Sequence, residues 1–116
     1  MDETCRNAYD SFLNTVKTDL PAFIEQMNYS EIEKAADLIV DAQKNGGRVH
    51  ISGIGKPGHL SVYIASLLSS TGNPAYFLHG TEAVHGSCGQ LVSGDVVIFI
   101  SNSGETAEMR STVLAV

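Results

Sequence analysis

A run of small polar residues follows the most apolar segment of the chain. This run, Ser101-Asn102-Ser103-Gly104-Glu105-Thr106, comes directly after Asp95–Ile100, and it leads into a segment with helical character. Hydroxyl groups and the unpaired amides of a helix N-terminus bind anions, and glycine lets the backbone approach the ligand. The alternative is an ordinary helix cap formed by Asn102 with Glu105, which needs one such group rather than a cluster.

A second candidate segment is the glycine-rich turn Gly53-Ile54-Gly55-Lys56-Pro57-Gly58. Its G-x-G-x-x-G pattern is also that of dinucleotide-binding domains, so a nicotinamide-dependent oxidoreductase is an alternative. That function requires an Asp or Glu at the end of the next strand. The sequence has Leu78-His79-Gly80 there. Lys56 can pair with a phosphate or stabilise a negative oxygen, or it can be a solvated surface lysine.

The third segment, from His79 to Gly86, has two histidines six residues apart with Glu82 between them. This spacing matches no tetrahedral zinc pattern, so we expect no metal there. We also expect that the protein uses no cofactor. A general acid or base is the functional interpretation, because imidazole titrates near neutral pH. A histidine bonded to the backbone at a helix end is the structural alternative, mainly for His79. His50 is expected to be structural.

The elements that must position these segments follow from hydrophobic periodicity. Apolar residues three or four apart predict a helix over 5–28, interrupted by Pro21 after Asp19. A second helix is predicted from an N-cap at Ser30 to the Asn45-Gly46-Gly47 stop. Strands at 49–51, 75–78 and 95–100 then alternate with helices at 57–70 and 106–116, and strand 95–100 reads as buried on both faces.

This alternation indicates an open α/β fold with a parallel sheet and right-handed crossovers. We expect an N-terminal helical segment over 1–46 and the N-terminal portion of a ligand-binding domain over 47–116. Three strands are fewer than such sheets usually contain, so the chain is expected to be part of a longer domain.

Composition excludes several classes of function. A net charge of −6 with no basic stripe argues against nucleic-acid binding. No apolar run has the length needed to span a bilayer, and we expect that the acidic start is not a secretory signal. The two cysteines are far apart and predict free thiols in the cytoplasm.

Together the three segments resemble the sugar isomerase (SIS) domain family, and more specifically its D-arabinose 5-phosphate isomerase branch. That branch has G-x-G-K-S-G-H, S-T-G-x-P and H-P-x-E-A-x-H-G-D-L-G motifs before an S-N-S-G-E hallmark. This chain has the same order at matching spacing in Gly53–His59, Ser70–Pro74, His79–Gly89 and Ser101–Thr106. It departs from the branch at Pro57, which replaces a serine, and at Ser87-Cys88, which replaces Asp-Leu.

The resemblance implies a three-layer α/β/α sandwich of flavodoxin-like (SIS) type that binds a phosphosugar. It implies that residues 101–106 hold the substrate phosphate, that Gly53 and Gly55 belong to the substrate loop, and that Lys56, His85 and Glu108 lie in the active site. The implied reaction interconverts ribulose 5-phosphate and arabinose 5-phosphate through an enediol. The departures favour an alternative, a non-catalytic phosphosugar sensor. The family also implies a homodimer or homotetramer.

Overall fold

The computed structural model describes residues 2–116, and it groups them into two compact units, one ending at Lys34 and the other spanning Ala35–Val116. The helices are α1 (Glu3–Glu25), α2 (Tyr29–Lys44), α3 (Lys56–Ser70), the single turn α4 (Gly80–Ala83), the 3₁₀ turn η1 (Ser87–Gln90) and α5 (Ala107–Ala115). The strands are β1 (Val49–Gly53), β2 (Ala75–His79) and β3 (Val96–Ile100). No helix among the described residues is both long and apolar enough to cross a bilayer.

The N-terminal helices differ from the predicted ones in two details. Helix α1 continues through Pro21 instead of restarting there. Proline removes one backbone hydrogen bond, and Lys17, whose carbonyl loses its partner, is exposed so that water can replace it. Helix α2 starts before Ser30, whose hydroxyl donates to the Asn28 side chain at 2.8 Å. The amide of Ile32 bonds the Asn28 carbonyl, so the predicted cap at Ser30 is wrong.

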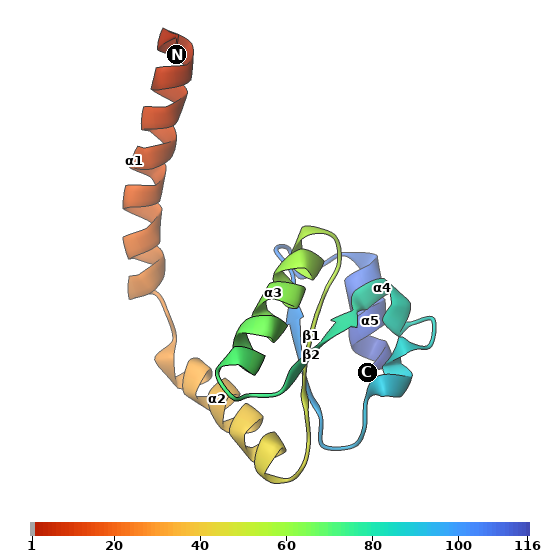
Figure 1. Cartoon of the computed structure of the whole chain (residues 1–116). Helices are drawn as coiled ribbons and strands as arrows, with labels where there is room; N and C mark the ends of the chain where they lie inside the picture. Colours follow the sequence, from red (N-terminus) through yellow and green to blue (C-terminus); the bar gives the residue numbers. More distant parts are fainter. Residues whose placement is uncertain (1) are drawn as a thin grey trace. The chain divides into compact units, whose positions relative to one another are not determined.

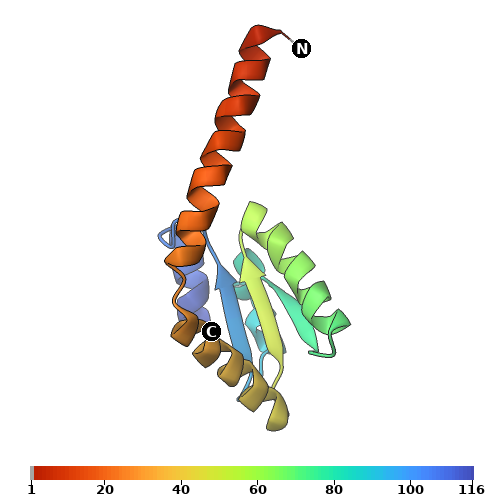
Figure 2. The same ribbon diagram turned by 90° about the vertical axis from the view of Figure 1, so that its left-hand side faces the viewer.

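The three strands form one parallel sheet in the order β2-β1-β3. Figure 2 shows β1 between its two neighbours. Helix α3 covers one face of the sheet, and α4 and α5 lie on the other, so the second unit has the predicted three layers (Figure 1). The mixed α/β fold class with a parallel sheet is confirmed.

The core lies between β1 and α3. Val49 and Ile51 are fully buried and pack with Ala65 of α3 and Ala75 of β2. Strand β1 is buried along its whole length, whereas every residue of β3 is only partly buried. The prediction that strand 95–100 is buried on both faces is therefore wrong for this chain, because β3 lies at the edge of the described sheet and β1 takes the central position.

Candidate functional site

The ends of the three strands bring the candidate segments to one edge of the sheet. In the parallel register Gly53 pairs with His79 of β2 and with Ile100 of β3. The residues that follow these positions therefore leave the sheet at the same edge, which is where open α/β sheets bind ligands. The glycine-rich turn, the segment with His85 and the 101–106 loop all begin there.

The loop at residues 101–106 has an internal hydrogen-bond pattern of its own. The amide of Gly104 donates to Ser101 Oγ at 2.9 Å, and the amide of Glu105 donates to Ser103 Oγ at 3.2 Å. Gly104 has a φ of 71°, a left-handed conformation that glycine adopts without strain. Each serine oxygen accepts a bond, so its hydroxyl hydrogen remains available to an anion.

Helix α5 begins well after Asn102, which rules out the ordinary cap considered for that residue. Thr106 is the N-cap, in an extended backbone conformation, and its side chain makes no capping bond. The first amides of a helix have no partner within the helix. The first turn of α5 therefore offers free N–H groups beside the hydroxyl of Thr106.

A pocket of about 220 Å³ separates this loop from the glycine-rich turn. Its lining includes three hydroxyl-bearing residues of the loop, Ser101, Ser103 and Thr106, and two residues of the turn, Ile54 and Pro57. Asn102, Ile100 and Met109 complete it. The structure thus brings two of the three predicted segments to one cavity, with three hydroxyl-bearing residues among its lining.

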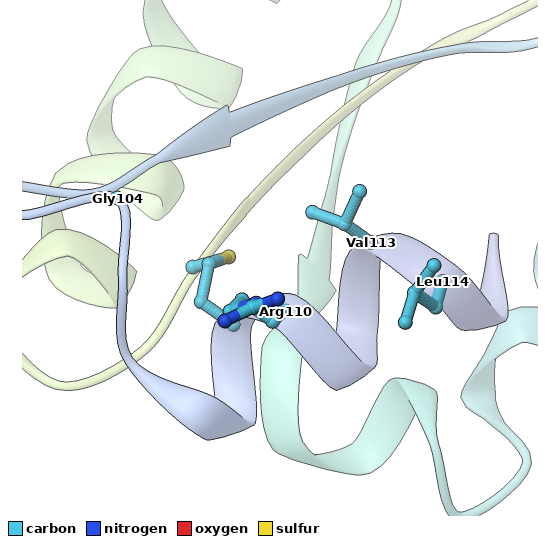
Figure 3. Close-up of a pocket in the computed structure, with 5 residues that line it drawn as sticks. Gly104, Arg110, Val113 and Leu114 are labelled. Atoms are coloured by element: carbon cyan, nitrogen blue, oxygen red, sulfur yellow. The ribbon is translucent and has the colours of Figure 1, made fainter.

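A second pocket, of about 250 Å³, is lined by Gly104 and by residues of α5 (Figure 3). Arg110, Val113 and Leu114 project from α5 around it, and Met109 also lines it. Apart from the Arg110 guanidinium, its side chains are apolar and it contains no hydroxyl group. The pocket lined by Ser101, Ser103 and Thr106 is therefore the better candidate for a phosphosugar.

The glycine-rich turn is fixed by close backbone packing. Gly55 is the N-cap of α3 with a φ of 67°, and Pro57 lies in the first helical turn, where its missing N–H has no helical partner to lose. A Cβ on Gly53 would lie 2.6 Å from the carbonyl carbon of Pro57. The buried hydroxyl of Ser61 donates to the Pro57 carbonyl at 2.8 Å. This packing holds the backbone on either side of Lys56.

The three residues implied as catalytic are Lys56, His85 and Glu108, and all three are exposed. Glu108 lies in the first turn of α5, and His85 follows α4, with its amide bonded to the Glu82 carbonyl at 3.0 Å. Within residues 2–116 their side chains form no hydrogen bond or ion pair with one another or with other residues. Their elements meet at one edge, but their side chains are not linked.

His79 has a structural contact. Its Nδ1 accepts the amide of Glu82 at 3.3 Å and caps α4, which is the helix-end interpretation given for this histidine. The imidazole also lines a third pocket, of about 260 Å³, with His59, Phe77 and residues of the glycine-rich turn. No carboxylate stands at the end of β2, where a dinucleotide-binding domain needs one. No cluster of three potential metal ligands forms among residues 2–116.

A polar network that was not predicted from the sequence lies at the opposite edge of the sheet. The Asp95 side chain is 2% exposed, and its Oδ2 lies 3.0 Å from Arg48 Nη2 and 3.0 Å from His50 Nε2. The amides of Arg48 and Val92 also donate to it. Burial raises the pKa of Asp95, but these hydrogen bonds outweigh burial, and the pKa lies well below its ordinary value.

This network supports the structural role expected of His50. Its Nδ1 lies 3.3 Å from Gln90 Nε2, and Arg48 Nη2 donates to the Gln90 carbonyl at 2.6 Å. Gln90 ends η1, so the network ties η1 to β1 and to the residue before β3. The only sequence signal was the placement of Arg48 and Asp95 just before two strands, which gives neither strand order nor pairing.

Comparisons with known proteins show the family of the chain. The family model of the SIS domain matches residues 42–116. The chain belongs to the SIS domain family. Its curated relatives include the arabinose 5-phosphate isomerase KdsD of Francisella tularensis, which is 37% identical over 112 residues, covering 94% of this chain and 33% of the relative. Another is the arabinose 5-phosphate isomerase GutQ of Escherichia coli K12, 47% identical over 76 residues, covering 66% of this chain and 23% of the relative.

Two solved structures are similar to this chain in fold and in more than a third of the aligned residues. An E. coli CFT073 protein in complex with arabinose 5-phosphate has a TM-score of 0.76 at 37% identity, with 99% of this chain and 60% of that one covered. A Bacteroides fragilis protein assigned as a phosphosugar isomerase involved in capsule formation has a TM-score of 0.79 at 36% identity, with 93% and 57% covered. The chain thus spans a third or less of the length of the two curated relatives.

Proposed function

We propose that the full-length protein is an aldose–ketose isomerase that interconverts arabinose 5-phosphate and ribulose 5-phosphate. The supporting observation is the pocket of about 220 Å³ shared by the 101–106 loop and the glycine-rich turn. In this proposal the hydroxyls of Ser101, Ser103 and Thr106, with the free amides at the start of α5, hold the phosphoryl group. Homology to arabinose 5-phosphate isomerases supports the choice of substrate.

The reaction needs an acid/base pair and a cation beside the sugar. A base removes the proton on the carbon next to the carbonyl, which gives an enediol, and the neighbouring carbon is then reprotonated. One C–H bond is broken and another is formed on the neighbouring carbon, while a proton moves from the hydroxyl oxygen to the carbonyl oxygen. The sugar undergoes no net oxidation or reduction, so the reaction consumes no cofactor. We assign Glu108 and His85 as the acid/base candidates and Lys56 as the cation that stabilises the enediolate oxygens.

Isotope exchange tests the assignment. The full-length protein should exchange the C2 proton of arabinose 5-phosphate with deuterated water, as followed by proton NMR. Glu108→Gln and Lys56→Ala should each lower the exchange rate by about a hundredfold or more. General acid–base catalysis contributes about that factor at Glu108, and electrostatic stabilisation of the enediolate contributes about as much at Lys56. Glu33→Gln and Lys44→Ala change the same groups on the exposed surface of α2 and should retain the wild-type rate.

Together with a binding measurement, the exchange experiment distinguishes an isomerase from a phosphosugar sensor. The sensor is motivated by Ser87, which stands where the branch has an aspartate, and by Pro57 in the turn. Calorimetric binding of arabinose 5-phosphate with no exchange in the wild-type protein would support the sensor. Exchange at the wild-type rate in both Glu108→Gln and Lys56→Ala would refute the catalytic assignment.

A further inference from the structure

Thr112 makes a buried contact between two elements of the candidate site. It lies one helical turn after Glu108 on α5 and is fully buried. Its Oγ1 is 2.7 Å from the carbonyl oxygen of Gly80 and 2.9 Å from that of Glu108. A hydroxyl has one hydrogen to donate, and the shorter distance favours Gly80, which is 32 residues away in sequence.

Gly80 lies in contact with both α5 and the glycine-rich turn. It is the first residue of α4, after which the chain continues to His85. A Cβ on Gly80 would lie 2.6 Å from Ile54 Cγ1 and 3.3 Å from the Gly53 carbonyl oxygen, so the glycine-rich turn packs directly against it. Ile54 precedes Lys56 by two residues. A bond to Gly80 therefore fixes α5 against both other segments.

We infer that Thr112 is a positioning residue, whose hydroxyl sets the place of Glu108 relative to His85 and Lys56. This inference rests on the proposed isomerase function. Thr112 lines none of the pockets described above, so it acts through the two elements that it joins and not through the substrate. Side chains that are exposed and unlinked, as these three are, depend on their backbone segments for alignment.

The test compares two substitutions in the full-length protein. Thr112→Val keeps the shape of the side chain and removes the hydroxyl, and Thr112→Ser keeps the hydroxyl. We expect Thr112→Val to lower kcat for arabinose 5-phosphate by about tenfold, because small displacements of reacting groups are costly, and to leave KM within about twofold. Thr112→Ser should restore kcat to within about twofold of the wild type. Thermal unfolding shows that each variant is folded at the assay temperature.

A kcat for Thr112→Val within twofold of the wild type would overturn the inference, and so would a Thr112→Ser variant as slow as Thr112→Val. If Thr112→Val does not fold, Thr112→Cys takes its place, since a thiol is a weak donor of similar size. Glu108→Gln is measured in parallel. Loss of exchange in Glu108→Gln with normal Thr112 variants refutes only the positioning role, whereas no exchange in the wild type refutes the proposed isomerase.

Discussion

The hydroxyl groups of Ser101 and Ser103 can order their loop and also remain able to bind an anion. Each hydroxyl oxygen accepts an amide two or three residues ahead, which holds the loop in shape without a ligand. The hydroxyl hydrogens and the first amides of α5 are then free to donate to an anion. Two serines can in this way order the loop and still bind a phosphoryl group.

Removing one of these hydroxyls should weaken ligand binding more than it weakens the fold. We expect Ser103→Ala to lower the affinity for arabinose 5-phosphate by about tenfold, the equivalent of one hydrogen bond to a charged group. Isothermal calorimetry on the full-length protein measures this. Ser66→Ala, an exposed position on α3, should bind normally. Equal affinities for the two variants would argue against a phosphoryl group on Ser103.

Gly53 offers a second prediction at the scale of a residue, because its neighbours leave no room for a side chain. A Cβ would lie 2.6 Å from the Pro57 carbonyl carbon and 2.8 Å from Ser61 Oγ. We expect Gly53→Ala to lower the free energy of unfolding by about 2 kcal/mol, as overpacking does. Gly89→Ala meets nothing within 4 Å and should change it by less than about 0.5 kcal/mol. Urea denaturation compares them, and equal midpoints would contradict the packing argument.

The elements of the second unit were largely predictable from sequence, and the exceptions have physical causes. Strand and helix positions from Val49 onward follow from apolar runs and glycine stops that act locally. The partial burial of β3 could not be predicted from its apolar sequence, because burial depends on which strand lies at the edge of the sheet. The short turns α4 and η1 were missed since their stability comes from contacts such as the His79 cap and the bonds of Gln90, which hydrophobic periodicity does not report.

The candidate site was likewise predictable only where the signal is local in the sequence. The 101–106 loop and the glycine-rich turn were identified from residue types and spacing, and the parallel register explains why they share a pocket. Thr112 was not identified, because a threonine within a helix carries no sequence signal for a partner 32 residues away. The Asp95 network was missed for the same reason.

The hydrogen bonds of Asp95 should make the stability of the fold decrease at acidic pH. The pKa of Asp95 is lowered in the folded protein, so its contribution to stability is complete above the unfolded pKa of about 4 and is lost as the pH falls below it. We expect Asp95→Asn to cost about 3 kcal/mol at pH 7, because it leaves Arg48 and His50 without their buried carboxylate. Denaturation at pH 7, 5 and 3 measures the difference between wild type and variant. A difference that did not shrink below pH 4 would contradict this account.

At the scale of the whole molecule, α1 carries apolar side chains that nothing within its own unit covers. It has no buried residue, and Phe12 and Phe23 are each 64% exposed. Exposed apolar surface of this extent is typical of a contact surface. A homodimer or homotetramer, as the family resemblance implies, remains a prediction.

Light scattering on the full-length protein tests that prediction. The wild type should have the mass of a dimer or tetramer. Phe12→Asp should lower that mass, because it places a charge among the exposed apolar side chains of α1. Asn14→Asp adds the same charge at a neighbouring polar position and should leave the mass unchanged. A monomeric wild type, or equal masses for the two variants, would show that α1 does not form a contact between subunits.

The central claim, that the 101–106 loop holds the phosphoryl group, is tested most directly by a crystal structure of the full-length protein with arabinose 5-phosphate. The account predicts phosphate oxygens within about 3 Å of the hydroxyls of Ser101, Ser103 and Thr106, in the pocket between the loop and the glycine-rich turn. A phosphate bound instead in the pocket of His59 and His79, or beside Arg110, would contradict it.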